Sequence, residues 1–140
     1  MTVPSASPLS PAALVVGSHA AADEAPAVVA VVVAQEPGER FDELLGSLAD
    51  QDYPNISVLV IDTASVPVAD RLAQVLPEAF HHRSQPKLGF AAAANQAMEL
   101  VSGGAFFLFC TDGVTLSPRA VSDLVEELYR SNAGIVTPKY

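Results

Sequence analysis

The feature that most constrains the fold is an unbroken run of mostly β-branched residues at positions 28–33, Val-Val-Ala-Val-Val-Val. The run has the length of a strand and lacks the polar alternation of a strand with one face in water. Continuous apolar runs of this kind are typical of strands that are buried on both faces of a parallel sheet. We therefore expect ordered structure to begin at this strand.

The remainder of the chain alternates between helical and strand patterns. Apolar residues recur at helical spacing in several segments, and Ser117-Pro118 is a typical N-cap and first residue of a helix. Strands that alternate with helices imply right-handed crossovers and a doubly wound, mostly parallel α/β sheet with helices on both faces. We expect helices at residues 38–49, 68–76, 90–101 and 117–128, and further strands at residues 56–62, 79–83, 105–110 and 134–136.

Residues 1–27 differ from the rest of the chain because they are rich in Pro, Ser and Ala and show no sustained period. We interpret them as a disordered leader that precedes one α/β domain at residues 28–140. No apolar stretch approaches the ~20 residues of a membrane-spanning helix. No Lys or Arg precedes the short apolar patch at residues 12–16, so a signal peptide is poorly supported.

The net charge of -9, from 16 acidic and 7 basic residues, argues against nucleic acid and anionic lipid surfaces as partners. A bound nucleotide therefore needs local backbone amides, a cation or a few placed side chains. The single Cys110 excludes an internal disulfide, and its apolar neighbours predict a small core residue.

Ligands of doubly wound sheets bind beyond the carboxyl ends of the strands. Gln35 follows the first predicted strand, Asp62 ends the second, and Thr111, Asp112 and Gly113 follow the strand at 105–110. These are the positions at which we expect a binding site.

The order of the motifs resembles the N-terminal half of the family-2 inverting glycosyltransferases, which have the Rossmann-like A-type glycosyltransferase fold. The resemblance covers residues 28–140 and becomes specific because the pieces occur in order and at the right spacing. They are residues 28–35, residues 41–54 with Leu-Leu-Gly-Ser-Leu and Gln-Asp-Tyr-Pro, and residues 58–65, 89–97 and 107–114.

The resemblance assigns a nucleotide-binding role to several strand-end residues. Asp62 stands where the family has a carboxylate that contacts the base or the ribose, and Gln35 is a second contact of this kind. Gly89 opens a helix whose N-terminus favours phosphate, and Lys87 adds positive charge there. The residues also have plain alternatives: a turn-capping aspartate, an exposed loop glutamine and an ordinary alanine-rich helix, in which we expect Asn95 to be buried.

The family's metal site is degraded in this sequence. The resemblance implies two aspartates, one residue apart, that hold Mg²⁺ or Mn²⁺ at the donor diphosphate. Thr111 and Gly113 occupy those two positions, and only the middle residue, Asp112, is a carboxylate. We expect Asp112 to contact the nucleotide and to bind metal weakly or not at all; a plain Asp-Gly turn is the alternative.

No residue is assigned as catalytic. The family supplies its general base from a segment downstream of this region, and the chain ends at Tyr140. Glu126 and Glu127 are expected on a solvated helix face, and His81 and His82 lack a constellation with serine, cysteine or a carboxylate that would assign them chemistry. We therefore expect the isolated chain to be inactive.

Three functions remain in competition. The first is the nucleotide-sugar-binding part of a larger enzyme of cell-envelope polysaccharide or glycolipid synthesis. Such an enzyme would be cytoplasmic, or held at the inner face of the membrane by a downstream domain or a membrane protein partner. The second is a non-catalytic module, derived from the same fold, for protein interaction or regulation. The third is a flavodoxin-like or receiver-like domain, which the pair Asp62 and Asp112 mimics only superficially.

Overall fold

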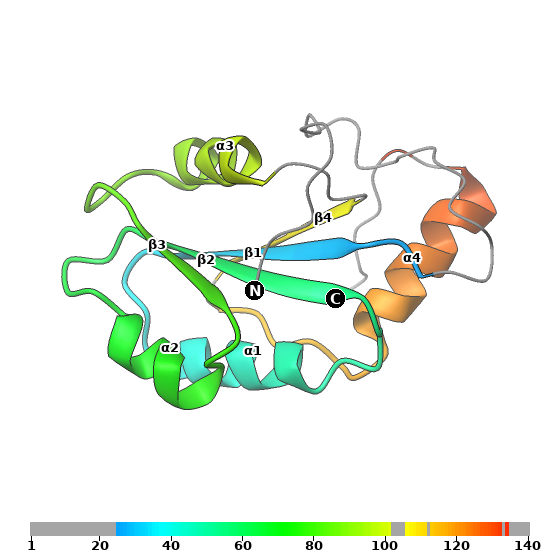
Figure 1. Ribbon diagram of the computed structural model, residues 1–140, viewed down its shortest axis with the longest axis horizontal. Helices are drawn as coiled ribbons and strands as arrows, with labels where there is room; N and C mark the ends of the chain where they lie inside the picture. The colour runs from blue at the N-terminus through cyan, green and yellow to red at the C-terminus, as the bar shows by residue number, and fades with distance from the viewer. Residues whose placement is uncertain (1–24, 102–105, 112, 133, 135–140) are drawn as a thin grey trace.

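The computed structural model describes residues 25–101, 106–111, 113–132 and 134, in which strands and helices alternate (Figure 1). The strands are β1 (Val28–Ala34), β2 (Ile56–Asp62), β3 (Phe80–Arg83) and β4 (Phe106–Thr111), and the helices are α1 (Glu39–Ala49), α2 (Ala69–Val75), α3 (Phe90–Leu100) and α4 (Ala120–Ser131). The strands pair in parallel in the order β3-β2-β1-β4. The predicted doubly wound α/β fold is confirmed. The leader at residues 1–24 and most of the strand expected at 134–136 lie outside the described residues.

All seven residues of β1 are buried, as the apolar run predicts. The strand lies between β2 and β4, and helices cover both faces of the sheet, α1 and α2 on one and α3 on the other (Figure 1). Ala30 and Val32 pack on the first face, whereas Val29 and Val31 pack on the second. Each fully buried valine contributes about 1.5–3 kcal/mol, so β1 anchors both halves of the core.

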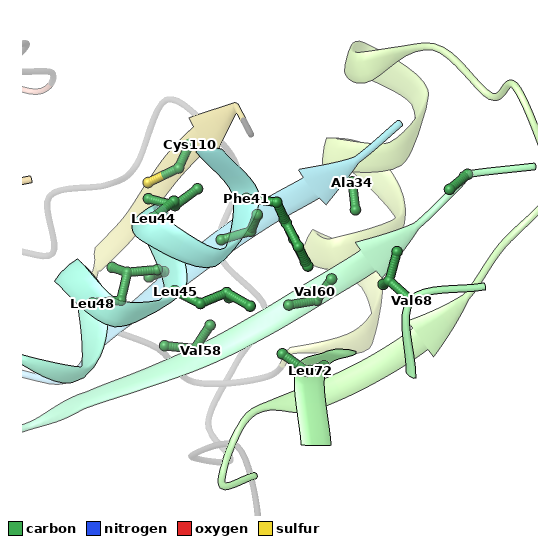
Figure 2. Packing of buried hydrophobic residues seen from close by; sticks show 13 residues of the cluster. Ala34, Phe41, Leu44, Leu45, Leu48, Val58, Val60, Val68, Leu72 and Cys110 are labelled. Carbon is green, nitrogen blue, oxygen red and sulfur yellow. The ribbon is translucent and has the colours of Figure 1, made fainter. Parts of the chain in front are cut away.

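Helix α1 places its apolar residues at the spacing of one helical face. Phe41, Leu44, Leu45 and Leu48 are all buried, and Figure 2 shows them against the sheet residues of the same cluster. Cys110 of β4 lies in this cluster, and burial raises the pKa of its thiol to about 12. The prediction of a core cysteine is confirmed.

Helix α3 packs on the opposite face through small residues. Ala93 and Ala97 are fully buried against a cluster that includes Leu59 and Ile61 of β2. Alanine at these positions lets the helix approach the sheet closely. No helix within the described ranges is long and apolar enough to cross a membrane.

Residues 25–27, which the sequence pattern places in the leader, contact the sheet and its loops. The Tyr53 hydroxyl donates a hydrogen bond to the carbonyl oxygen of Pro26, and burial raises the pKa of Tyr53 to about 12. The Phe106 amide donates to the carbonyl oxygen of Ala27 at 3.0 Å. Ordered structure therefore includes at least three residues before β1.

Helix α4 begins later than the sequence indicates. Its N-cap is Arg119, not Ser117, and the Arg119 side chain does not cap the helix. Gln51, which follows α1, replaces the local cap. The Val121 amide donates a hydrogen bond to Oε1 of Gln51 at 3.0 Å. Nε2 of Gln51 donates to the carbonyl oxygen of Ser117 at 2.7 Å. Gln51 belongs to the Gln-Asp-Tyr-Pro motif, so this motif fastens α4 to the end of α1.

Candidate functional site

The parallel register brings the carboxyl ends of the strands to one edge of the sheet. Ala34 lies opposite Asp62, Asp62 lies opposite Arg83, and Val33 lies opposite Thr111. The loops that follow these strands are consequently neighbours. We call the described residues 34–37, 62–68, 83–89, 111 and 113 the carboxyl edge.

Thr63 ties the first three loops of the carboxyl edge together. Its amide and its hydroxyl both donate to the carbonyl oxygen of Ala34, at 2.9 and 3.2 Å. Its own carbonyl oxygen accepts from the amide of Lys87 at 2.8 Å. Thr63 is fully buried, so these bonds are shielded from water.

A second set of bonds joins the exposed parts of the same loops. Glu36 Oε1 accepts from the amide of Ser65 at 3.1 Å and from its hydroxyl at 2.8 Å. Gln35 Nε2 donates to the carbonyl oxygen of Leu88 at 3.4 Å, near the upper limit of a hydrogen bond. Gln35 is exposed, and this long bond leaves it free to turn towards a ligand.

Asp62 is fully buried, and both of its carboxylate oxygens are already occupied by donors of the protein. Oδ1 accepts from the Ala64 amide at 3.1 Å and from Arg83 Nη1 at 3.0 Å. Oδ2 accepts from the Val68 amide at 2.8 Å and lies 2.8 Å from His81 Nε2. Asp62 therefore pins the loop at residues 63–68, and a nucleotide could reach this carboxylate only by displacing one of its partners.

The surroundings of Asp62 favour its ionised form. Burial raises the pKa of the carboxyl group, but the hydrogen bonds from His81, Val68 and Ala64 and the charge of Arg83 together outweigh burial. The net effect lowers the pKa below its ordinary value of 3.8. The cluster thus holds a negative charge that the protein itself compensates.

Sequence reasoning missed two residues of β3, His81 and Arg83, that contact Asp62. The absence of a carboxylate partner, inferred for His81 from the sequence, is wrong because strand pairing brings Asp62 of β2 beside both residues of β3. The side chains of His81 and Arg83 are 24% and 32% exposed. The alternate positions 81 and 83 of a strand share one face, and this spacing beside a strand that ends in Asp62 is the signal that could have revealed them.

Lys87 and Gly89 lie in the loop that leads into α3. Lys87 is exposed and has a φ of 66°, a left-handed backbone conformation that is uncommon outside glycine. Gly89 is the N-cap of α3 and has an ordinary extended backbone; a Cβ added to it would meet nothing within 4 Å. The backbone at the start of α3 is therefore open to an approaching ligand.

Asn95 is exposed, so its predicted burial is wrong. The neighbouring Gln96 takes the expected part, because its Oε1 accepts a hydrogen bond from the Ser84 hydroxyl at 2.6 Å. This bond ties α3 to the end of β3. The helix presents position 96, not position 95, to the loop.

Two of the three residues at the expected metal position bring no carboxylate. Thr111 and Gly113 are both exposed and bring no carboxylate, and Asp112 lies outside the described residues. Hard cations take several oxygen ligands, and Mg²⁺ is bound in proteins through one or two carboxylates together with waters and substrate phosphates. Within residues 25–101, 106–111, 113–132 and 134, no three His, Cys, Asp or Glu side chains gather in a group that could hold a metal ion.

Comparison with models of protein families gives a match over most of the chain. The model of "Glycosyl transferase family 2" matches residues 28–140, which is most of the chain. A search of curated protein sequences found no matching relative.

Solved structures with the same arrangement of elements include two glycosyltransferase-fold proteins. Residues 1–349 of TarS from S. aureus, in complex with UDP, superpose with a TM-score of 0.62 at 18% identity, covering 81% of this chain and 38% of that one. Mannosyltransferase PcManGT from Pyrobaculum calidifontis, in complex with GDP-Man and Mn²⁺, gives 0.64 at 22% identity, covering 76% of this chain and 33% of that one. The chain thus spans about a third of the length of the structures that it resembles.

Proposed function

Because the chain belongs to glycosyl transferase family 2, we propose that its carboxyl edge binds the nucleotide of a nucleotide-activated sugar. The observation that carries the proposal is the tying of three strand-end loops into one edge by the bonds of Thr63 and Asp62. An edge that is ordered before the ligand arrives loses little entropy when the ligand binds.

The predicted site residues take different parts in this proposal. Gln35 is free to contact the base or the ribose, and Lys87 with the open N-terminus of α3 at Gly89 faces the phosphates. Asp62 shapes the edge from within, because its oxygens hold the loop and the side chains of His81 and Arg83. Asp112 remains in the proposal as a nucleotide contact and a poor metal ligand.

The chain is proposed to be the nucleotide-binding part of a larger glycosyltransferase. Support comes from its coverage of about a third of TarS and PcManGT, the first in complex with UDP and the second with GDP-Man and Mn²⁺. Following the resemblance, we place the enzyme in cell-envelope polysaccharide or glycolipid synthesis. We place the enzyme in the cytoplasm. If a downstream region or a partner protein anchors it, the enzyme lies at the inner face of the membrane.

The runner-up function is a non-catalytic module for protein interaction or regulation. Thr111 and Gly113 favour it, because they stand where the family has its two metal-ligating aspartates. A module that does not transfer a sugar needs no metal-bound diphosphate, so these aspartates can be replaced without loss of its function. The two functions differ in one cheap measurement, since a module of this kind would be folded and yet bind no nucleotide.

Titration calorimetry of the purified chain with UDP and GDP tests the proposal. We expect saturable binding of at least one diphosphate, and we expect Asp62→Asn to weaken it, because the loop at residues 63–68 and the side chain of Arg83 lose the carboxylate that holds them. Asp42→Asn, which changes a carboxylate of α1 in a surface ion pair with Arg71, is the matched control and should bind as the wild type does. A folded chain that binds neither diphosphate would reject the proposal in favour of the module.

A further inference from the structure

The carboxyl edge poses a problem of charge. A nucleoside diphosphate is an anion, the chain carries a net charge of -9, and the carboxylates that would recruit a cation are missing at positions 111 and 113. Some group of the chain must therefore compensate the phosphates if the proposed function holds.

Arg83 is positioned to provide this charge. Its Nη1 donates to Asp62 Oδ1 at 3.0 Å and to the Ala64 carbonyl oxygen at 2.6 Å, so the guanidinium is held at two points. Its Nε and Nη2 have no protein partner within the described part of the chain, and 32% of the side chain is exposed. A planar guanidinium with free donors on one side can receive phosphate oxygens in bidentate fashion.

The anchoring of Arg83 distinguishes it from the other cation of the loop. Lys87 is exposed, and its ammonium must give up side-chain entropy to hold one position. Arg83 has already given up this freedom to Asp62, which lies beneath it without any exposure to water. The Nε2 atom of His81 lies 2.8 Å from Oδ2 of the same carboxylate, beside Arg83.

We propose, on the basis of the proposed function, that Arg83 contacts the nucleotide diphosphate in place of a divalent cation, with Asp62 as the residue that positions it. Diphosphate binding by this chain is then independent of Mg²⁺ and Mn²⁺. In this proposal Arg83 compensates the negative charge of the diphosphate, which the family's cation compensates in other members.

The test compares ligands with and without phosphate. UDP with uridine, and GDP with guanosine, are titrated into the wild type, Arg83→Gln, Arg83→Lys and the control Arg130→Gln, in EDTA and again in Mn²⁺. Arg130 is an equally charged, exposed residue of α4 that pairs with Glu127 of the same helix and lies outside the carboxyl edge. The binding of the diphosphates and nucleosides is followed by NMR into the millimolar range, and circular dichroism reports whether each variant is folded.

We expect Arg83→Gln to lower diphosphate affinity about 10- to 100-fold, the usual range for a hydrogen bond to a charged group, and to change nucleoside affinity less than about twofold. Arg83→Lys should retain part of the lost affinity, Arg130→Gln should retain all of it, and Mn²⁺ should change the wild-type affinity less than about twofold.

Two results would overturn the inference while leaving the proposed function intact. One is an equal loss of diphosphate and nucleoside affinity in Arg83→Gln, which would mean that Arg83 serves only as the partner of Asp62. The other is wild-type diphosphate binding that appears in Mn²⁺ and vanishes in EDTA. Wild-type protein that binds no nucleotide under either condition would reject the proposed function and this inference together.

Discussion

Replacing Asp62 by alanine should destabilise the fold far more than removal of any surface carboxylate. The change strands the amides of Ala64 and Val68, both buried, and each unsatisfied buried donor costs about 1–3 kcal/mol. Arg83 and His81 also lose their carboxylate, but both are partly exposed and regain some hydration from water. We therefore expect a loss of about 3–5 kcal/mol in the free energy of unfolding, the range for breaking a buried pair from one side.

Urea denaturation followed by circular dichroism measures this loss. The control is Asp42→Ala, which removes the partner of Arg71 from a solvent-exposed ion pair and should cost at most about 1 kcal/mol. If Asp62→Ala and Asp42→Ala lose the same small amount, the four contacts of Asp62 carry no net stability and the reasoning about the carboxyl edge fails.

Four further outcomes follow from the same structure. Because the pKa of Asp62 is lowered in the folded state, its stabilising contribution is complete above about pH 4 and is lost as the pH falls through the folded-state value; acid titration of stability should be less steep in Asp62→Asn than in the wild type. Gln51→Ala should cost about 1–3 kcal/mol in urea denaturation and speed hydrogen exchange at the start of α4, whereas Gln74→Ala on the exposed face of α2 should do neither. Removal of residues 1–24 should leave the thermal midpoint unchanged within about 2 °C in calorimetry, since we expect this leader to add little packing. The isolated chain should form no glycoside from radiolabelled nucleotide sugars with Mn²⁺ and lipid or saccharide acceptors, because no general base is matched and the cation site is degraded; metal-dependent product that Asp112→Ala abolishes would contradict this.

The strands and helices could be predicted because their signals are local. Apolar runs indicate β1 and β2, and the helical spacing of Phe41, Leu44 and Leu48 indicates α1. The start of α4 differs from the predicted one, because a residue distant in sequence caps the helix. Ser117 is an adequate local N-cap, but Gln51, just after α1, accepts a hydrogen bond from the first turn of α4. A sequence pattern does not show a contact of this kind.

The candidate site was predictable in place but not in detail. The carboxyl edge follows from the order of strands and loops, and Gln35, Asp62 and Lys87 all lie on it. The pairing of Asp62 with His81 and Arg83 depends on the register between β2 and β3, which local propensity does not encode. The carboxylate therefore lies inside the protein, where it holds the Val68 amide and the side chain of Arg83.

The central position of β1 in the sheet has a consequence during synthesis of the chain on the ribosome. Of the described strands β1 is synthesised first, yet it needs β2 on one side and β4 on the other. The last of these emerges roughly 80 residues later, or roughly 4–16 seconds at ordinary rates of translation. Until then a strand of valine and alanine exposes at least one unpaired edge, which is the state most prone to nonspecific association with other chains. Nascent chains stalled between β2 and β4 should therefore be the strongest clients of ribosome-associated chaperones.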